Sequence, residues 1–125
     1  MSGLVLTLRE EPRQRVDMTP LTPDRVAGKS LKDVGSTELL CGNRMLRTDA
    51  LFEISGSPVV AGEQAKITIA KSSSKLHNIG AAMTQGTVDV SGDAGAYVGF
   101  GMRGGLIRVS GNAGGFAACA GVVAG

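Results

Sequence analysis

The chain has 125 residues, of which 42% are hydrophobic and only 3% aromatic, and its formal net charge is +2. This length suits one compact domain with an aliphatic core, and the scattering of the basic residues argues against a nucleic-acid-binding surface. The apolar run 4–8 is followed at once by Arg9, Glu10 and Glu11, which argues against a secretory signal and favours a cytoplasmic location.

The first elements expected along the chain are a strand and a short helix. Residues 4–8 alternate leucine with valine and threonine, which is the period of a half-buried strand, and Pro12 ends this stretch. Thr22 with a proline at the next position is typical of a helix N-cap, and Gly28 predicts the end of that helix after one or two turns.

Further short elements are expected up to residue 57. A second helix is predicted to start at Ser30, where Asp33 imitates the capping-box pattern, and to close at Gly35. Residues 39–41 and 51–54 predict two short strands, because turn residues follow each of them.

An internal repeat is the most informative feature of the second half. Residues 79–95 align with residues 98–114, so the period is nineteen residues, and a fainter earlier copy includes residues 66–69. The pairs that are identical in the two main copies are Gly80/Gly99, Met83/Met102, Gly86/Gly105, Val90/Val109, Ser91/Ser110, Gly92/Gly111, Ala94/Ala113 and Gly95/Gly114.

The period of this repeat is too short for a helical hairpin and fits one coil of a solenoid made of short strands and tight corners. Residues 88–90 and 107–109 each place two aliphatic side chains around one charged residue, which predicts a strand with one buried and one exposed face. The segments rich in glycine, asparagine and aspartate that follow these strands predict the corners.

Stacked coils place equivalent positions roughly 4.8 Å apart. Equivalent aliphatic residues then form continuous buried rows, and opposite charges at equivalent outer positions form an ion pair that stabilises the fold modestly at most. The pairs expected on this basis are Val90 with Val109, Met83 with Met102, and Asp89 with Arg108.

The string from Gly99 to Gly104 matches the dinucleotide-binding pattern G-x-G-x-x-G, but its context favours corner glycines. That pattern requires a helix after it, whereas residues 106–109 predict a strand. His77 is the only histidine. Without a second histidine it is interpreted as a surface or packing residue rather than a metal ligand or an acid–base group.

The remaining polar candidates also have structural interpretations, so we expect no catalytic, cofactor-binding or metal-binding residue in this chain. Asp89 and Asp93 are separated by a corner, which argues against a carboxylate pair. Residues 72–74 are three serines with no activating base nearby, which favours a solvated loop. Cys41 and Cys119 have no metal-ligand spacing and are interpreted as buried thiols in a reducing compartment rather than a disulfide.

The carboxyl end, residues 109–125, carries no charged residue. It contains five glycines, which makes it too short and too weakly apolar for a membrane span. The third copy of the repeat degenerates after Gly114, without the glycine expected at 118 or the methionine expected at 121. An uncapped solenoid end exposes backbone and apolar groups, so either further coils are missing or a partner covers that end.

Several stretches of the sequence resemble a known family, namely 6–12, 22–30, 51–56 and the repeat segments 92–99 and 102–105. The family they resemble is that of the C subunit of formylmethanofuran dehydrogenase and its bacterial counterpart in the formyltransferase/hydrolase complex. The resemblance spans essentially the whole chain. The repeat is also similar to the carboxy-terminal β-helix of the glutamate synthase large subunit, but the amino-terminal pattern favours the formyl complex.

The resemblance implies an all-β fold, a right-handed single-stranded parallel β-helix of about three coils. Residues 1–57 would form an irregular amino-terminal extension used for docking, and residues 58–125 the β-helix. The family is longer than this chain, so the β-helix is expected to be truncated at its carboxyl end.

The resemblance also implies a non-catalytic structural subunit in one-carbon metabolism. The complex that contains it would convert formyl-tetrahydromethanopterin to formate through a methanofuran-type carrier. This complex would be a cytoplasmic hetero-oligomer that also contains amidohydrolase-like and formyltransferase-like subunits. No cofactor is expected on this chain; in dehydrogenase forms, molybdenum or tungsten pterin and iron–sulfur clusters belong to other subunits. The alternative is a β-helix module of a glutamate-synthase-type amidotransferase.

Overall fold

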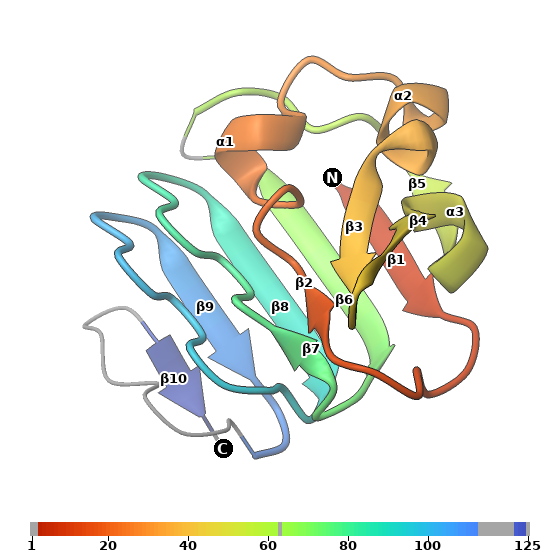
Figure 1. Cartoon of the computed structure of the whole chain (residues 1–125). Coiled ribbons are helices and arrows are strands. Elements are labelled where there is room, and N and C mark those ends of the chain that lie inside the picture. Colours follow the sequence, from red (N-terminus) through yellow and green to blue (C-terminus); the bar gives the residue numbers. More distant parts are fainter. Residues whose placement is uncertain (1–2, 63, 113–121, 125) are drawn as a thin grey trace.

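The structure, a computed structural model, describes residues 3–62, 64–112 and 122–124 and is built mainly from two sheets (Figure 1). The larger sheet has six strands in the order β10-β9-β8-β6-β1-β5, and the smaller has four in the order β4-β3-β2-β7. The strands of the larger sheet are β1 (Leu4–Leu8), β5 (Phe52–Gly56), β6 (Lys66–Ser72), β8 (Thr87–Gly92), β9 (Leu106–Val109) and β10 (Val122–Ala124).

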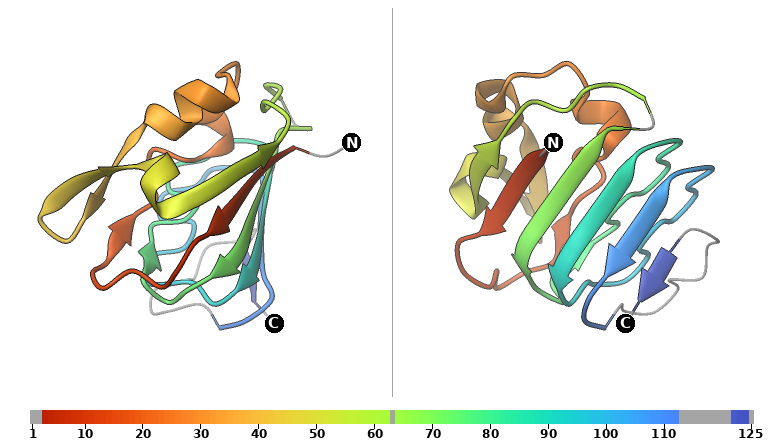
Figure 2. Two further views of the ribbon diagram at one scale, coloured as in Figure 1. Left: turned by 90° about the vertical axis from the view of Figure 1, so that its right-hand side faces the viewer. Right: turned by 180° about the vertical axis from the view of Figure 1, so that it is seen from behind.

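The smaller sheet lies in front of the larger one in Figure 1, and in the side view its β3–β4 hairpin projects away from the larger sheet (Figure 2). The strands of the smaller sheet are β2 (Val16–Asp17), β3 (Glu38–Cys41), β4 (Arg44–Arg47) and β7 (Leu76–His77). The helices are α1 (Pro23–Val26), α2 (Leu31–Ser36) and α3 (Thr48–Leu51).

Strands β6, β8, β9 and β10 follow one another in the larger sheet, and each pair of neighbours is parallel. Thr87 of β8 faces Leu106 of β9, and the register continues to Val90, which faces Val109. The nineteen-residue repeat is therefore the spacing of two neighbouring parallel strands. This confirms both the expected strands and the expected valine pair.

The loops that lead to these strands stack on one another as well. The Gly99 N–H donates a hydrogen bond to the Ile79 carbonyl at 2.8 Å. Asn78 and Tyr97 occupy equivalent corners in successive loops, and both are left-handed, with φ of 62° and 63°. Asparagine tolerates this conformation through local hydrogen bonding, whereas at a tyrosine it is uncommon, and Tyr97 was not expected at such a corner.

The amino-terminal half departs from this parallel pattern. Strand β1 pairs in parallel with β6 on one side and antiparallel with β5 on the other, and β3 and β4 form an antiparallel hairpin. The structure thus confirms a β-rich fold with a few short helices. It does not confirm a parallel β-helix, because strand pairing is mixed in both sheets.

Two elements of the first half begin where the sequence predicts. Strand β1 covers the alternating run 4–8, with its three leucines buried. Helix α1 starts after Thr22, whose Oγ1 accepts a hydrogen bond from the Arg25 N–H at 3.3 Å, and Gly28 follows the helix with a φ of 80°.

Two expected boundaries are wrong. Gly35 does not close the second helix but lies inside α2, where an added Cβ would lie 3.2 Å from the Asp49 side chain. Glycine there allows α2 to pack closely on α3. Leu51 is not in a strand but ends α3, because the Phe52 N–H bonds back to the Thr48 carbonyl and closes a helical turn; β5 begins only afterwards.

The core lies between the two sheets and is largely aliphatic, as the composition predicts. Ile67, Val88 and Ile107 occupy matched positions in β6, β8 and β9, and none is more than 1% exposed. Met83 is fully buried, whereas Met102 is only partly buried against the core. The expected methionine row therefore contributes to the core mainly through its first member.

In the described ranges, no helix is long and apolar enough to cross a bilayer. The degenerate third repeat after Gly114, including Cys119, lies outside the described residues, apart from β10. Val122 of that strand faces Ile107 of β9 in parallel, so the stacking of strands continues to the end of the described chain.

Candidate functional site

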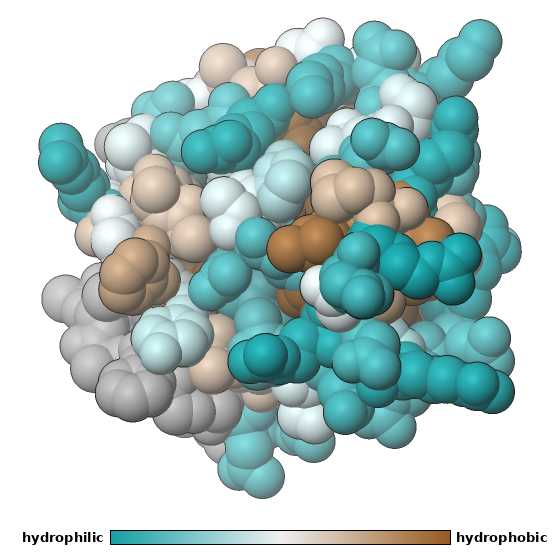
Figure 3. Space-filling view, in the orientation of Figure 1, coloured by the Kyte–Doolittle hydropathy of each residue, from teal (hydrophilic) through white to brown (hydrophobic). Residues whose placement is uncertain are grey.

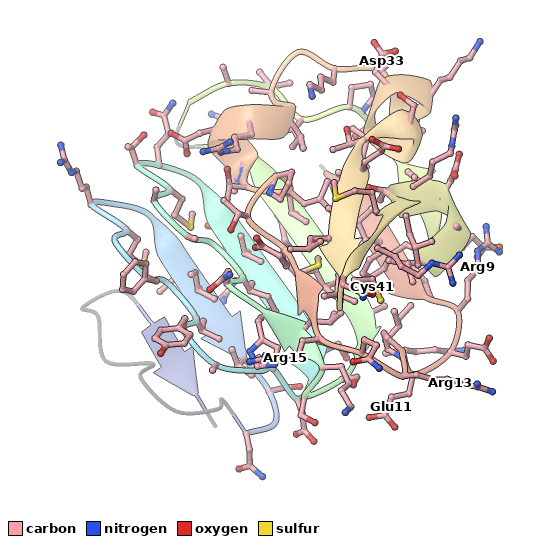
Figure 4. All side chains as sticks on the ribbon, viewed as in Figure 1. Arg9, Glu11, Arg13, Arg15, Asp33 and Cys41 are labelled. Carbon is pink, nitrogen blue, oxygen red and sulfur yellow. The ribbon has the colours of Figure 1, made fainter. Side chains whose placement is uncertain are left out.

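A groove of about 580 Å³ lies on the face of the smaller sheet, where β2, β3 and β7 meet the loop that carries Tyr97. Figure 4 labels Arg15, which lines this groove, and Cys41, which ends the neighbouring strand β3. The polar residues that line the groove are Gln14, Arg15, Asp17, Asn43, His77 and Asn78, and Leu40 and Tyr97 border it. We call it the Arg15 groove.

Strand β2 holds the floor of the Arg15 groove in place. It pairs in parallel with β7, antiparallel with β3, and the Met18 N–H donates to the His77 carbonyl at 2.8 Å. Val16 and Met18 are buried, so the alternation along the strand leaves Arg15 and Asp17 on the groove side.

His77, the only histidine, lies in this groove. Its Nδ1 accepts a hydrogen bond from the Ala96 N–H at 3.1 Å. The pKa of His77 is lowered, first by burial and then by the nearby positive charges of Arg15 and Lys75. The negative charge of Asp17 raises this pKa, but by less. The imidazole is therefore neutral near pH 7, and its remaining proton is on Nε2. This fits the predicted packing role, because the ring bridges two successive loops.

Asp17 is the single carboxylate among the described residues that line the groove, and its acceptor capacity is used within the protein. Its Oδ1 accepts hydrogen bonds from the Thr19 N–H and from Asn78 Nδ2, both at 3.0 Å. Burial raises the pKa of Asp17, but these hydrogen bonds outweigh it, and the pKa is lowered overall. Asp17 therefore stays ionised and positions Asn78 rather than acting as a base.

The groove residues do not form a catalytic arrangement. The described lining contains no serine, cysteine or lysine nucleophile, and its carboxylate and imidazole are each engaged with the protein. Arg15 makes no ion pair among the described residues. The site is therefore rich in hydrogen-bond donors and suits binding of an acceptor group such as a carboxylate. Sequence reasoning missed this groove, because its residues come from four separate segments.

The predicted charge pair lies on the other sheet, away from the groove. Arg108 Nε donates to Asp89 Oδ1 at 2.8 Å, and Lys66 Nζ lies 3.3 Å from Asp89 Oδ2. Burial raises the pKa of Asp89, but the hydrogen bonds from Arg108 and Lys66 lower it by more. The expected pair is confirmed, and Lys66 from the earlier, fainter copy adds a third member.

The glycine string from Gly99 to Gly104 lies in a loop and leads directly into strand β9, not into a helix. A Cβ at Gly104 would lie 2.3 Å from the Thr84 carbonyl oxygen. Close stacking of successive loops therefore explains this glycine, and the dinucleotide-binding context is not present.

The acidic candidates are not brought together. Asp93 Oδ1 accepts from the Asn112 N–H at 2.9 Å, while Asp89 is engaged with Arg108 at a different place. Among the described residues, no cluster of three or more histidine, cysteine, aspartate or glutamate side chains could hold a metal ion.

The serine and cysteine candidates differ from one another in their surroundings. Ser73 is buried and its Oγ donates to Glu11 Oε2 at 3.0 Å, and Ser72 ends strand β6, so the prediction of a solvated loop over residues 72–74 is wrong for these two serines. The neighbouring Ser72 Oγ is buried and has no hydrogen-bond partner in the described structure. Cys41 is a free thiol that is only half-buried, which corrects the prediction of a fully buried one.

No family model matches the chain. It is 38% identical over 99 residues to the C subunit of tungsten-containing formylmethanofuran dehydrogenase 2 from Methanothermobacter wolfeii, covering 79% of this chain and 37% of that protein. It is also 35% identical over 90 residues to the C subunit of the formyltransferase/hydrolase complex Fhc from Methylorubrum extorquens, covering 72% of this chain and 32% of that protein. The chain belongs to this C-subunit family.

A solved structure agrees with membership of the C-subunit family. A chain in the crystal structure of the formyltransferase/hydrolase complex (FhcABCD) from Methylorubrum extorquens in complex with methylofuran superposes with a TM-score of 0.63. It is 28% identical, and the match covers 96% of this chain and 53% of that chain. The present chain spans about a third of the length of the curated C-subunit proteins that it matches.

Proposed function

We propose that this chain is a non-catalytic structural subunit of a formylmethanofuran dehydrogenase-like or formyltransferase/hydrolase complex. The observation that carries the proposal is the similarity to C-subunit proteins over 79% of the chain. The chemistry of the Arg15 groove supports it, since the groove offers hydrogen-bond donors for binding, and its described lining has no nucleophile paired with a base.

A right-handed parallel β-helix is the architecture that we propose for residues 58–125, with residues 1–57 as the docking extension. Parallel pairing from β6 to β10 and stacked loops between the strands support this architecture. Each coil hides the apolar side of its neighbour, as in the row of Ile67, Val88 and Ile107. Such a rod suits a scaffold because it presents long, regular surfaces to other subunits.

The chemistry of the complex is proposed to take place on other subunits, in the cytoplasm. The methanofuran-type carrier would be bound there and, in dehydrogenase forms, so would molybdenum or tungsten pterin and iron–sulfur clusters. The partners proposed for this chain are an amidohydrolase-like and a formyltransferase-like subunit, in a hetero-oligomer that moves a formyl group from tetrahydromethanopterin to the carrier and releases formate.

Co-purification tests this proposal. The tagged chain, produced in its own cells at native level, is expected to bring down an amidohydrolase-like and a formyltransferase-like subunit in fixed stoichiometry. Recovery of a flavin and iron–sulfur protein instead would support a glutamate-synthase-type module. Recovery of the chain alone from cells that contain the formyl-transfer subunits would contradict both assignments.

A further inference from the structure

The Arg15 groove has apolar side chains on both of its sides. On one side, Leu40 of β3 and Met45 of β4 are cross-strand partners and are 43% and 53% exposed. On the other side, Tyr97 and Phe100 are 40% and 61% exposed, and their rings meet edge to face with centroids 5.7 Å apart. Figure 3 shows apolar surface on either side of a polar band on this face.

These exposed side chains are of the kinds that protein interfaces use. Aromatic residues, methionine and arginine are enriched in interface centres, where they are buried by the partner. Large apolar side chains gathered on two sides of one groove are unusual on a surface that only faces water.

Arg15 is the one cationic side chain in the described lining of the groove, and Lys75 lies close enough to affect His77. Arg15 and Lys75 make no ion pair among the described residues. Their combined charge outweighs that of Asp17 in its effect on the pKa of His77. Asp17 is itself held by Thr19 and Asn78. A ligand group that pairs with Arg15 therefore carries negative charge, and a carboxylate can accept two parallel hydrogen bonds from its guanidinium.

We propose that the Arg15 groove docks an extended segment of a partner subunit. A carboxylate side chain of that segment binds Arg15. The apolar residues on either side of this carboxylate pack on Leu40 and Met45 and on Tyr97 and Phe100. The proposal rests on the proposed function for the identity of the partner, and adds the surface and the chemistry of contact. A small free carboxylate would satisfy Arg15 but would leave both apolar sides of the groove exposed.

The test uses the chain co-produced with the amidohydrolase-like and formyltransferase-like subunits. Arg15→Glu reverses the charge of the floor, and Leu40→Glu places a charge on one apolar side; both residues are exposed, so the fold is retained. We expect each variant to lower recovery of the partner by about tenfold or more, as for a central interface residue. Matched controls are Lys32→Glu on α2 and Val60→Glu in the loop after β5, which are exposed outside the groove and are expected to assemble normally.

A photocrosslinking amino acid at position 45 identifies the segment that docks. We expect the adduct to map to one partner peptide with an aspartate or glutamate beside apolar residues. Changing that acidic residue to lysine is expected to restore binding to the Arg15→Glu variant.

Two contrary results are distinguishable. If the unaltered chain assembles and the two groove variants assemble equally well, or if no partner peptide crosslinks to position 45 in the assembled complex, the groove is not the docking surface. In that case the proposed function survives. If the unaltered chain fails to assemble with these subunits, the proposed function fails and this inference fails with it.

Discussion

Arg108 and Asp89 lie nineteen residues apart in the sequence and face each other across β8 and β9, with Arg108 Nε donating to Asp89 Oδ1 at 2.8 Å. Lys66, one strand further, reaches the other oxygen of the same carboxylate at 3.3 Å. One aspartate thus joins three successive parallel strands on the outer face of the larger sheet.

The first prediction concerns this shared aspartate. Asp89→Asn is expected to lower the melting temperature at pH 7, because Arg108 and Lys66 then lose their common anion and repel each other. The loss is expected to shrink in high salt, since these groups are partly exposed. Glu53→Gln, at an exposed position without an ion pair among the described residues, is the matched control and is expected to melt like the unaltered chain.

The pH dependence of that loss has a definite sign. The pKa of Asp89 is lowered below 3.8 in the folded chain, so the stabilisation is present above pH 3.8 and is lost as the pH falls below it. The melting difference between Asp89→Asn and the unaltered chain is therefore expected to persist down to this pH and to vanish below it. A difference that instead grew as the pH fell would show that the pair does not stabilise the fold.

The second prediction concerns the close packing of the glycine string. Gly104→Ala is expected to destabilise the chain by about 1–3 kcal/mol, because the new methyl group would overlap the Thr84 carbonyl. Gly101→Asn is the control, since a side chain there meets no atom within 4 Å and asparagine tolerates its φ of +71°. Urea unfolding measures both. Equal losses at the two positions would argue against close loop stacking as the reason for Gly104.

The third prediction concerns the buried row across the stacked strands. Ile107→Ala is expected to cost about 2–5 kcal/mol, because Ile107 is fully buried beside Val88 in the row and truncating its side chain leaves a cavity. Val60→Ala, at a side chain that is 64% exposed, is expected to change stability by no more than about 0.5 kcal/mol. Denaturant midpoints give the comparison, and a similar small loss at Ile107 would contradict the described core.

The fourth prediction uses His77 as the single histidine of the chain. Its pKa is lowered from 6.5 in the folded state, so the unfolded chain takes up the proton first, and stability is expected to fall as the pH drops below about 6.5. His77→Asn keeps an acceptor near the Ala96 N–H but does not titrate. Melting temperatures between pH 7.5 and pH 5.5 are expected to decline for the unaltered chain and to stay level for the variant.

Much of the larger sheet could be predicted from local sequence. The alternation in residues 4–8 and the nineteen-residue repeat predict β1, β8 and β9, because a strand with one buried face needs a period of two, and equivalent positions in stacked coils come into register. The family resemblance could be recognised for the same reason, since its repeat is a local pattern.

Boundaries that depend on packing could not be predicted. Gly35 was expected to end a helix, but it lies within α2, where an added Cβ would lie 3.2 Å from the Asp49 side chain of α3. The left-handed corner at Tyr97 follows from the stacking of its loop on the loop before it, not from any preference of tyrosine.

The sequence by itself determined which strands repeat, which residues of those strands face the core and which family the chain resembles. Each of these depends on a pattern of residues that are close together in the sequence. Only the tertiary structure decided that the first half inserts β1 between β5 and β6 and that Arg15, Leu40 and His77 share one groove. Those residues lie on separate segments, and only the pairing of β2 with both β3 and β7 brings them together.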